Sequence, residues 1–168
     1  MASNDKPYSG KKKKREPTAA EILQRQPPFD LDAEMGVLGS ILLLPEVCDE
    51  IPSLRPDDFY DDANRKIYEI LRDMHDSGDK IDITLLVSRL RTAGEYEKVG
   101  GAGYLAKLSA SVPNAAHAIY YAEIVAEKAV YRKLISSGTE ILRNAYEQSS
   151  TAKELCAQAE QKIFAIMD

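Results

Sequence analysis

The longest pattern of apolar and polar positions in this chain lies in its last third. Between Ala115 and Tyr146 the chain has no proline and a single glycine, Gly138, and apolar residues recur every three or four positions. This spacing predicts a helix over residues 115–147, with Asn114 as its N-cap. At about 1.5 Å per residue such a helix is about 50 Å long, whereas the usual helix of a globular protein has about 11 residues. A compact domain therefore cannot cover it along its whole length.

A polar stretch at residues 147–151 (EQSST) ends this pattern, and a second amphipathic run follows from Ala152 to Met167. Two helices joined by a short polar turn predict an antiparallel helical hairpin over residues 113–168. We expect the hairpin to project from whatever precedes it and to contact another molecule.

Shorter helical patterns occupy residues 27–112 and predict a small head of about six helices. Asp30, Asp61 or Asp62, and Asp82 each precede an apolar run, in the position where an aspartate caps a helix N-terminus. The inward-facing positions of these helices are Leu31, Met35, Leu38, Leu42, Ile67, Ile70, Leu71, Met74, Ile83, Leu86, Val87, Leu90, Leu105 and Leu108.

Two further details of the head follow from its sequence. The turn at residues 55–60 is expected to direct the rings of Phe59 and Tyr60 inward, and Gly36 and Gly39 predict close approach of another helix to the first head helix. Strand patterns are hard to find anywhere in the chain. The predicted fold class is therefore all-α: a small helical head followed by a long helical hairpin.

Composition narrows the class of protein. The chain has 168 residues and 44% hydrophobic content, which is enough for one core. No apolar run approaches the roughly 18 residues of a membrane-spanning helix, so we expect no membrane association and a cytoplasmic location. The two cysteines, Cys48 and Cys156, are far apart in helical patterns, which favours a reducing compartment over a disulfide framework.

Charge is unevenly distributed along the chain. Residues 1–26 carry seven Lys/Arg and three Asp/Glu, a net charge of +4, and the remainder carries the other 15 basic and 24 acidic residues, a net charge of −9. The basic run at residues 11–15 has nothing apolar to bury, so residues 1–26 are expected to be a disordered tail. The acidic body repels phosphate backbones, whereas the tail could attract single-stranded DNA weakly.

The sequence offers no catalytic constellation. The Walker A pattern for nucleotide phosphates is missing, and the glycines at residues 101–103 follow no predicted strand. His75 and His117 lie on different elements without metal-ligand spacing. The aspartate pairs at 57–58 and 61–62 fit helix capping better than a calcium loop. We therefore expect no catalytic residue, cofactor or metal in this chain.

The long predicted helix has more apolar positions than one partner helix can cover. One line of them is Tyr120, Ile124, Tyr131, Leu134, Ile141 and Ala145, and Val130, Ile135 and Leu142 lie off it. The second hairpin helix offers a single stripe of Leu155, Ala159, Ile163 and Ile166. We expect one stripe to close the hairpin and the remainder to support a contact with another protein, although each residue could instead be core. The candidate interface residues are Tyr120, Tyr131, Ile135, Ile141 and Leu142.

Four blocks of sequence carry a resemblance to a known family. Residues 27–39 (PPFDLDAEMGVLG) resemble the opening of bacterial replicative helicases of the DnaB type. The DDFY of residues 57–60, with IY at 67–68, is similar to the next family block. VGG at residues 99–101 with YL at 104–105, and AA at 115–116 with YAEIV at 121–125, are similar to the two that follow. Each block is weak alone, but four in register are specific.

The resemblance covers residues 27–168 and implies the N-terminal domain of such a helicase. It implies a collar on a hexameric ring, commonly a trimer of dimers, that docks the C-terminal domain of primase and influences the helicase loader and DNA passage. ATP and Mg would belong only to a motor domain beyond residue 168. Asp32 keeps the charge of the family's glutamate, and Tyr104 matches the family's tyrosine. Both are therefore added as candidate interface residues.

Two other interpretations remain open from the sequence. A generic helical adaptor without a role in replication would share the fold but lack hexamer formation and a downstream motor. A free-standing enzyme or DNA-binding domain would have to bind single strands without residues 1–26.

Overall fold

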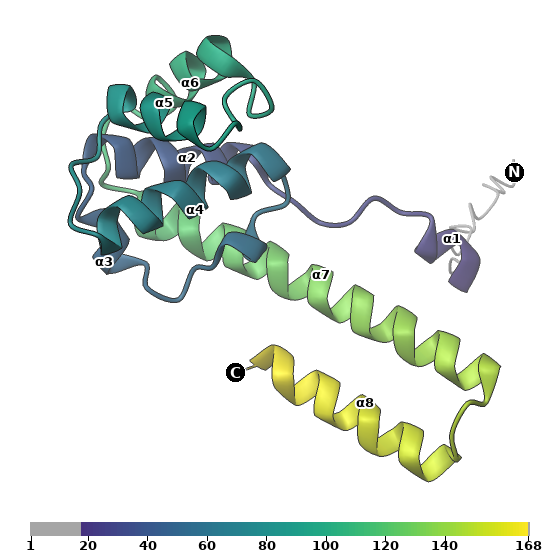
Figure 1. Ribbon diagram of the computed structural model, residues 1–168. Coiled ribbons are helices and arrows are strands. Elements are labelled where there is room, and N and C mark those ends of the chain that lie inside the picture. The colour runs from purple at the N-terminus through teal and green to yellow at the C-terminus, as the bar shows by residue number, and fades with distance from the viewer. Residues whose placement is uncertain (1–17, 168) are drawn as a thin grey trace, which may run out of the picture.

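The computed structural model describes residues 18–167, and every regular element in that range is helical. The elements are α1 (Ala19–Leu23), α2 (Leu31–Leu43), α3 (Val47–Glu50), the 3-10 turn η1 (Pro56–Asp58), α4 (Asp62–Asp76), α5 (Ile83–Thr92), α6 (Gly101–Ser109), α7 (Ala118–Glu147) and α8 (Ala152–Met167). The all-α prediction is confirmed, with a head of helices and a long hairpin that leaves it (Figure 1).

Helix α2 is the centre of the head. Its residues from Ala33 to Ile41 are all buried, and α4, α6 and the start of α7 pack around it. Gly36 allows one of these close approaches, because a Cβ there would lie 2.6 Å from the ring of Tyr121 on α7. The predicted caps are confirmed, since Asp30, the first of them, accepts from the backbone N–H of Ala33 at 2.9 Å. Equivalent caps at α4 and α5 fix where those helices begin.

The start of α7 differs from the prediction. The helix begins at Ala118, after His117, whereas Asn114 was the expected N-cap. Asn114 Oδ1 instead accepts from the N–H of Ala116 at 3.0 Å. This local bond, from a side chain to the backbone two residues ahead, stabilises a turn and so competes with helix formation. Residues 114–117 therefore form the last connection of the head and are not the first turn of the hairpin.

Helix α7 belongs to both parts of the molecule. Its buried residues are Ala118, Ala122, Val125 and Ala129, at alternating steps of four and three, and they pack into the head core. Past Ala129 no residue of α7 is fully buried, and the helix runs out of the head until α8 returns along it (Figure 1). The helix that carries the hairpin is thus rooted in the head by its first three turns.

The turn of the hairpin is built from local bonds. Gln148 ends α7 in the left-handed conformation at φ 50°. Thr151 and Glu154 then form a reciprocal cap at the start of α8, in which Glu154 accepts from both Thr151 N–H and Thr151 Oγ1. These bonds hold the pKa of the Glu154 carboxyl below its usual value. Lys162 bonds Glu140 across the two helices at 2.7 Å.

Replacing Gln148 by glycine is expected to stabilise the hairpin. The left-handed conformation costs a residue with a Cβ about 1 kcal/mol or more, whereas glycine adopts it freely. We expect Gln148→Gly to raise the free energy of unfolding by about 0.5–1 kcal/mol, measured by urea unfolding. Gln158→Gly, at an exposed position inside α8, is the matched control and should lower it by about the same amount.

Within the amino-terminal segment, the structure describes only residues 18–26. There α1 forms a single capped turn, in which Thr18 and Glu21 make the reciprocal cap bonds. The predicted disordered tail and its basic run at residues 11–15 otherwise lie outside the described residues.

Candidate protein-interaction site

One side of α7 carries an exposed apolar strip that we call the outer face. At about 100° per residue, its members lie within about 60° of one another around the helix. They are Tyr131, Ile135, Leu142 and Tyr146. The buried residues that fix α7 in the head lie about 120° away around the helix. Ile135 is 49% exposed and Tyr146 is 82% exposed, whereas Leu142 is half-buried, so the described residues leave most of this face uncovered.

The outer face corrects the sequence-based grouping of the apolar positions. Ile135 and Leu142 were set apart from the line that contains Tyr131, but all three share one side of the helix. Ile141 is half-buried and lies about 80° away from Tyr131. Tyr120 shares the outer orientation and is 63% exposed, but it lies three turns nearer the root of α7. The structure therefore brings together Tyr131, Ile135 and Leu142 from the predicted set.

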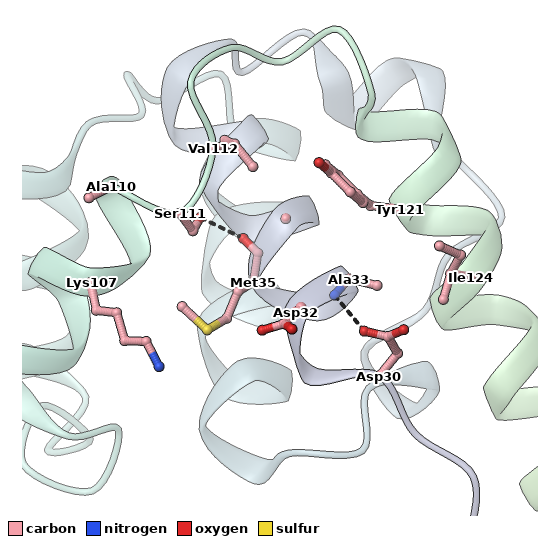
Figure 2. Close-up of a pocket in the computed structure, with 11 residues that line it drawn as sticks. Asp30, Asp32, Ala33, Met35, Lys107, Ala110, Ser111, Val112, Tyr121 and Ile124 are labelled. Atoms are coloured by element: carbon pink, nitrogen blue, oxygen red, sulfur yellow. Dashed lines mark hydrogen bonds between the residues drawn. The ribbon is translucent and has the colours of Figure 1, made fainter.

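The two candidates from the head lie elsewhere. Asp32 is exposed in the first turn of α2, at the edge of an open groove that also contains Lys107 (Figure 2). Tyr104 is half-buried on α6, and its hydroxyl donates to Asn64 Oδ1. Burial raises the pKa of Tyr104 to about 12, so the hydroxyl stays protonated as a donor. A partner could accept a hydrogen bond from this hydroxyl only by displacing Asn64.

Sequence reasoning missed two exposed aromatic residues on the hairpin. Tyr146, in the last turn of α7, is the most exposed large apolar residue described, and Phe164 on α8 is 61% exposed. Both could have been found from the same count of surplus apolar positions, because neither belongs to the stripe assigned to hairpin closure. Tyr146 extends the candidate surface to the far end of α7, whereas Phe164 lies near the C-terminal end of α8, which returns along α7.

A cluster around Arg132 fixes the hairpin to the head, and we call it the clasp. Arg132 Nη1 donates to the carbonyl of Pro28 at 2.9 Å, and its Nη2 donates to the carbonyl of Asp58. The guanidinium lies 5.7 Å from the centre of the Tyr60 ring, and that ring stacks on Phe29 with centroids 4.6 Å apart. One side chain of α7 therefore joins the segment before α2 to the turn before α4.

The clasp also explains why one aromatic prediction failed. Phe59 is buried as expected, but Tyr60 is 37% exposed and not inward. Successive residues of this extended segment point to opposite sides, so only one ring can enter the core. The Tyr60 ring instead lies between Phe29 and Arg132, where it contributes to the junction between head and hairpin.

The ion pair between Lys133 and Asp58 strengthens the same junction. Asp58 is buried, and its Oδ2 accepts from the N–H of Arg55 at 2.9 Å. Its Oδ1 accepts from Lys133 Nζ at 2.9 Å. A buried carboxylate needs such partners, because removing it from water without them is costly. Adjacent residues of α7 thus hold η1 through a backbone carbonyl and a carboxylate, which sets the direction in which the hairpin projects.

The geometry of the described residues offers contact surfaces and not a reaction centre. Across residues 18–167 no group of three or more His, Cys, Asp or Glu side chains is placed to hold a metal ion. Burial raises the pKa of the Cys48 thiol to about 11, so at neutral pH it is an inert core residue. No described helix is long and apolar enough to cross a membrane. Head, clasp and hairpin form one helical module that carries an exposed apolar strip.

Comparison with known proteins identifies the family of this module. The family described as "DnaB-like helicase N terminal domain" matches residues 26–127, which is more than half of the chain. The chain belongs to this family, as the four sequence blocks predicted. The match begins just before the clasp segment and ends within the buried part of α7.

Relatives of known name agree with this assignment. The chain is 36% identical over 152 residues to the replicative DNA helicase DnaB of Mycobacterium leprae, and it spans 25% of that protein. It is 37% identical over 145 residues to the replicative DNA helicase DnaC of Bacillus subtilis, of which it spans 32%. The chain therefore covers between a quarter and a third of the length of these relatives.

Two solved structures share the fold. One is the N-terminal domain of DnaB helicase from Mycobacterium tuberculosis, with a TM-score of 0.78 and 38% identity, covering 83% of this chain and 99% of that one. The other is a DnaB-like replicative helicase described with its interactions with primase, with a TM-score of 0.68 and 30% identity. It covers 82% of this chain, which in turn covers 31% of the helicase chain.

Proposed function

We propose that this chain is the N-terminal collar of a hexameric replicative DNA helicase and serves both self-assembly and docking of primase. The observation that carries the proposal is the outer face of α7, an exposed apolar strip on a projecting hairpin in a domain of this family. Apolar surface of this kind on a helical module marks a protein contact. The relatives named as replicative helicases, and the neighbour described with primase, support this role.

The wider assembly follows from the same proposal. Hairpins pair subunits into dimers, three dimers form the collar, and the C-terminal domain of primase binds on it, with the helicase loader as a further partner. ATP and Mg act in the motor domain of the full-length helicase, and single-stranded DNA passes through the assembled ring or contacts the basic tail weakly. The protein acts in the cytoplasm.

Primase binding gives the direct test of this role. Calorimetric titration of the chain with the C-terminal domain of its own primase, at physiological salt and with light scattering on the mixture, should show saturable binding. Fewer primase domains than helicase chains in the complex would support a docking site that is shared between subunits. If neither this chain nor the full hexamer produced heat at micromolar concentrations, primase docking would be wrong for this protein.

Ile135→Asn is expected to weaken assembly or primase binding without unfolding the domain. Half of the Ile135 side chain is already exposed, so its loss should cost less than about 0.5 kcal/mol of stability. Burial of its exposed half in an interface is worth about 1 kcal/mol, so the association constant should fall about fivefold to tenfold. Sedimentation and the titration described above measure this change, and thermal unfolding measures stability.

Leu85→Asn is the matched control for Ile135→Asn. Leu85 lies on α5 in the head and is 39% exposed, and it is not part of the outer face. Leu85→Asn should leave both the self-association of the chain and its binding of primase unchanged. A collapse of the melting temperature in Ile135→Asn would instead place this residue in the core, and equal losses in both variants would remove the special role of the outer face.

A further inference from the structure

The head contains an open groove that the outer face does not use. It has a volume of about 550 Å³ and lies between the start of α2, the end of α6 and the start of α7. Met35, Val112, Tyr121 and Ile124 give it apolar walls (Figure 2). Pockets of about 300–1,000 Å³ accept a small ligand or several side chains. The groove therefore has room for two aliphatic side chains.

The rim of the groove is acidic at one end. Asp30 and Asp32 lie there, with Lys107 on the facing side (Figure 2). Asp30 is engaged as the cap of α2 through its Oδ1, whereas Asp32 is exposed. A group that fits this groove would therefore combine apolar side chains with a neighbouring positive charge.

The chain itself carries a segment with this chemistry in α1. Ile22 and Leu23 are each 50% exposed, and Arg25 follows them two residues later. Among the elements of residues 18–167, none packs extensively against α1, which stands away from the head (Figure 1). A helix of five residues is marginal without tertiary support. The reciprocal cap of Thr18 and Glu21 favours the helical turn, but α1 needs a contact surface to be stable.

We call residues 18–28, which contain α1, the arm. The arm is directed away from the groove of its own chain. The clasp holds its base, because Arg132 bonds the carbonyl of Pro28 and Tyr60 stacks on Phe29. Two successive prolines, Pro27 and Pro28, restrict the backbone just before this point. In Figure 2 the chain leaves Asp30 on the side away from Val112 and Tyr121. A return of α1 to its own groove would require this anchored segment to reverse.

We propose that α1 of one chain docks in the groove of a second copy, with Ile22 and Leu23 against Met35, Val112 and Tyr121 and with Arg25 beside Asp32. This contact rests on the proposed assembly role but uses a surface other than the hairpin. Each chain then has one arm and one groove, so two copies can exchange arms reciprocally or a series of copies can join head-to-tail. Head-to-tail contacts close into a ring when the rotation between copies permits it.

Site-specific cross-linking of the 168-residue chain tests the contact. In a Cys156→Ser background, one chain carries Leu23→Cys on the arm and another carries Ala110→Cys at the groove edge. Cys48 is buried and does not interfere. We expect a disulfide-linked heterodimer from the mixture and none from either chain alone. No product from the mixture, or arm-to-arm dimers of the Leu23→Cys chain, would overturn the proposal. So would closure of the doubly substituted chain into a cross-linked monomer.

Charge reversal gives a second and independent readout. Arg25→Glu on the arm chain, or Asp32→Lys on the groove chain, should lower the cross-linking rate about threefold to tenfold, as expected when a rim ion pair becomes a repulsion. Combining the two reversed chains should restore the rate. Lys153→Glu, on α8, is the control and should not change it. Equal cross-linking rates in all combinations would show that Arg25 and Asp32 take no part in the contact.

Sedimentation of the same chains separates this inference from the proposed function. Self-association that persists in the absence of the arm-to-groove cross-link would reject the arm contact and leave the hairpin contact in place. Loss of the cross-link in Ile135→Asn, together with loss of self-association, would show that the arm contact does not form without the hairpin and would overturn it as an independent interface.

Discussion

Glu34→Ala is expected to lower the free energy of unfolding of this domain by about 3–5 kcal/mol, because it leaves three N–H donors without their acceptor and each such donor costs about 1–3 kcal/mol. Glu34 is 1% exposed and its carboxylate accepts three N–H donors. These are the backbone N–H groups of Tyr60 and Asp61, at 2.6 and 3.3 Å, and the side-chain amide of Asn64, at 2.8 Å. Alanine leaves all three without an acceptor in the core.

The measurement is urea unfolding followed by circular dichroism, with Glu123→Ala as the control. Glu123 is an exposed glutamate of α7, so its removal should change stability by less than about 0.5 kcal/mol. The loss of stability in Glu34→Gln should fall between those of the two alanine variants. The glutamine amide keeps one oxygen as an acceptor but places its NH2 donor against the backbone N–H groups. A change below about 1 kcal/mol in Glu34→Ala would show that water satisfies the three donors, and it would refute the structural role of this carboxylate.

Glu34 also shows where sequence reasoning reaches its limit. Its position in the first turn of a helix predicts a favourable interaction with the helix N-terminus, which is correct but incomplete. The donors that it serves lie 26 to 30 residues later in the chain. Asn64 relays the same network to Tyr104. Local spacing carries no information on such partners, so the sequence does not indicate that Glu34 is the centre of a buried polar network.

Local rules succeeded wherever the deciding interaction was local. The aspartate caps of α2, α4 and α5 and the polar turn between α7 and α8 depend on residues within four positions of one another. The apolar spacing of α7 likewise predicts a long helix. The three residues lost at its start reflect competition between two local bonds available to Asn114, which the sequence does not rank.

The candidate site was predictable in kind but not in detail. Surplus apolar positions on the hairpin indicate a contact surface, and two of the candidates, Tyr131 and Ile135, are exposed in the structure. Which side of α7 faces outward depends on how the helix is rooted by Ala122 and Ala129, and on the clasp. The fit of α1 to the groove depends likewise on the direction in which Pro28 is held. The outward side of α7 and the position of α1 are therefore both set by the packed head and not by the local sequence.

Arg132→Ala is the second substitution with a large expected effect, and its effect should be confined to the junction. Loss of two bonds from a charged donor and of the contact with Tyr60 should cost about 2–3 kcal/mol. Hydrogen exchange should rise at Phe29, at Tyr60 and in the middle of α7, while the buried turns of α2 keep their protection. Arg143→Ala, at an exposed position of the hairpin, should change nothing. Uniform loss of protection would mean that Arg132 supports the whole core.

The same variant connects the clasp to the arm. With Arg132 in place, the carbonyl of Pro28 is held and α1 points away from its own groove. Without it, the linker regains its freedom, and an intramolecular contact benefits from a tether short enough to give millimolar effective concentration. Arg132→Ala in the doubly substituted chain with Leu23→Cys and Ala110→Cys should therefore convert cross-links between chains into closed monomers. Unchanged intermolecular products would show that the two prolines alone set the direction of the arm.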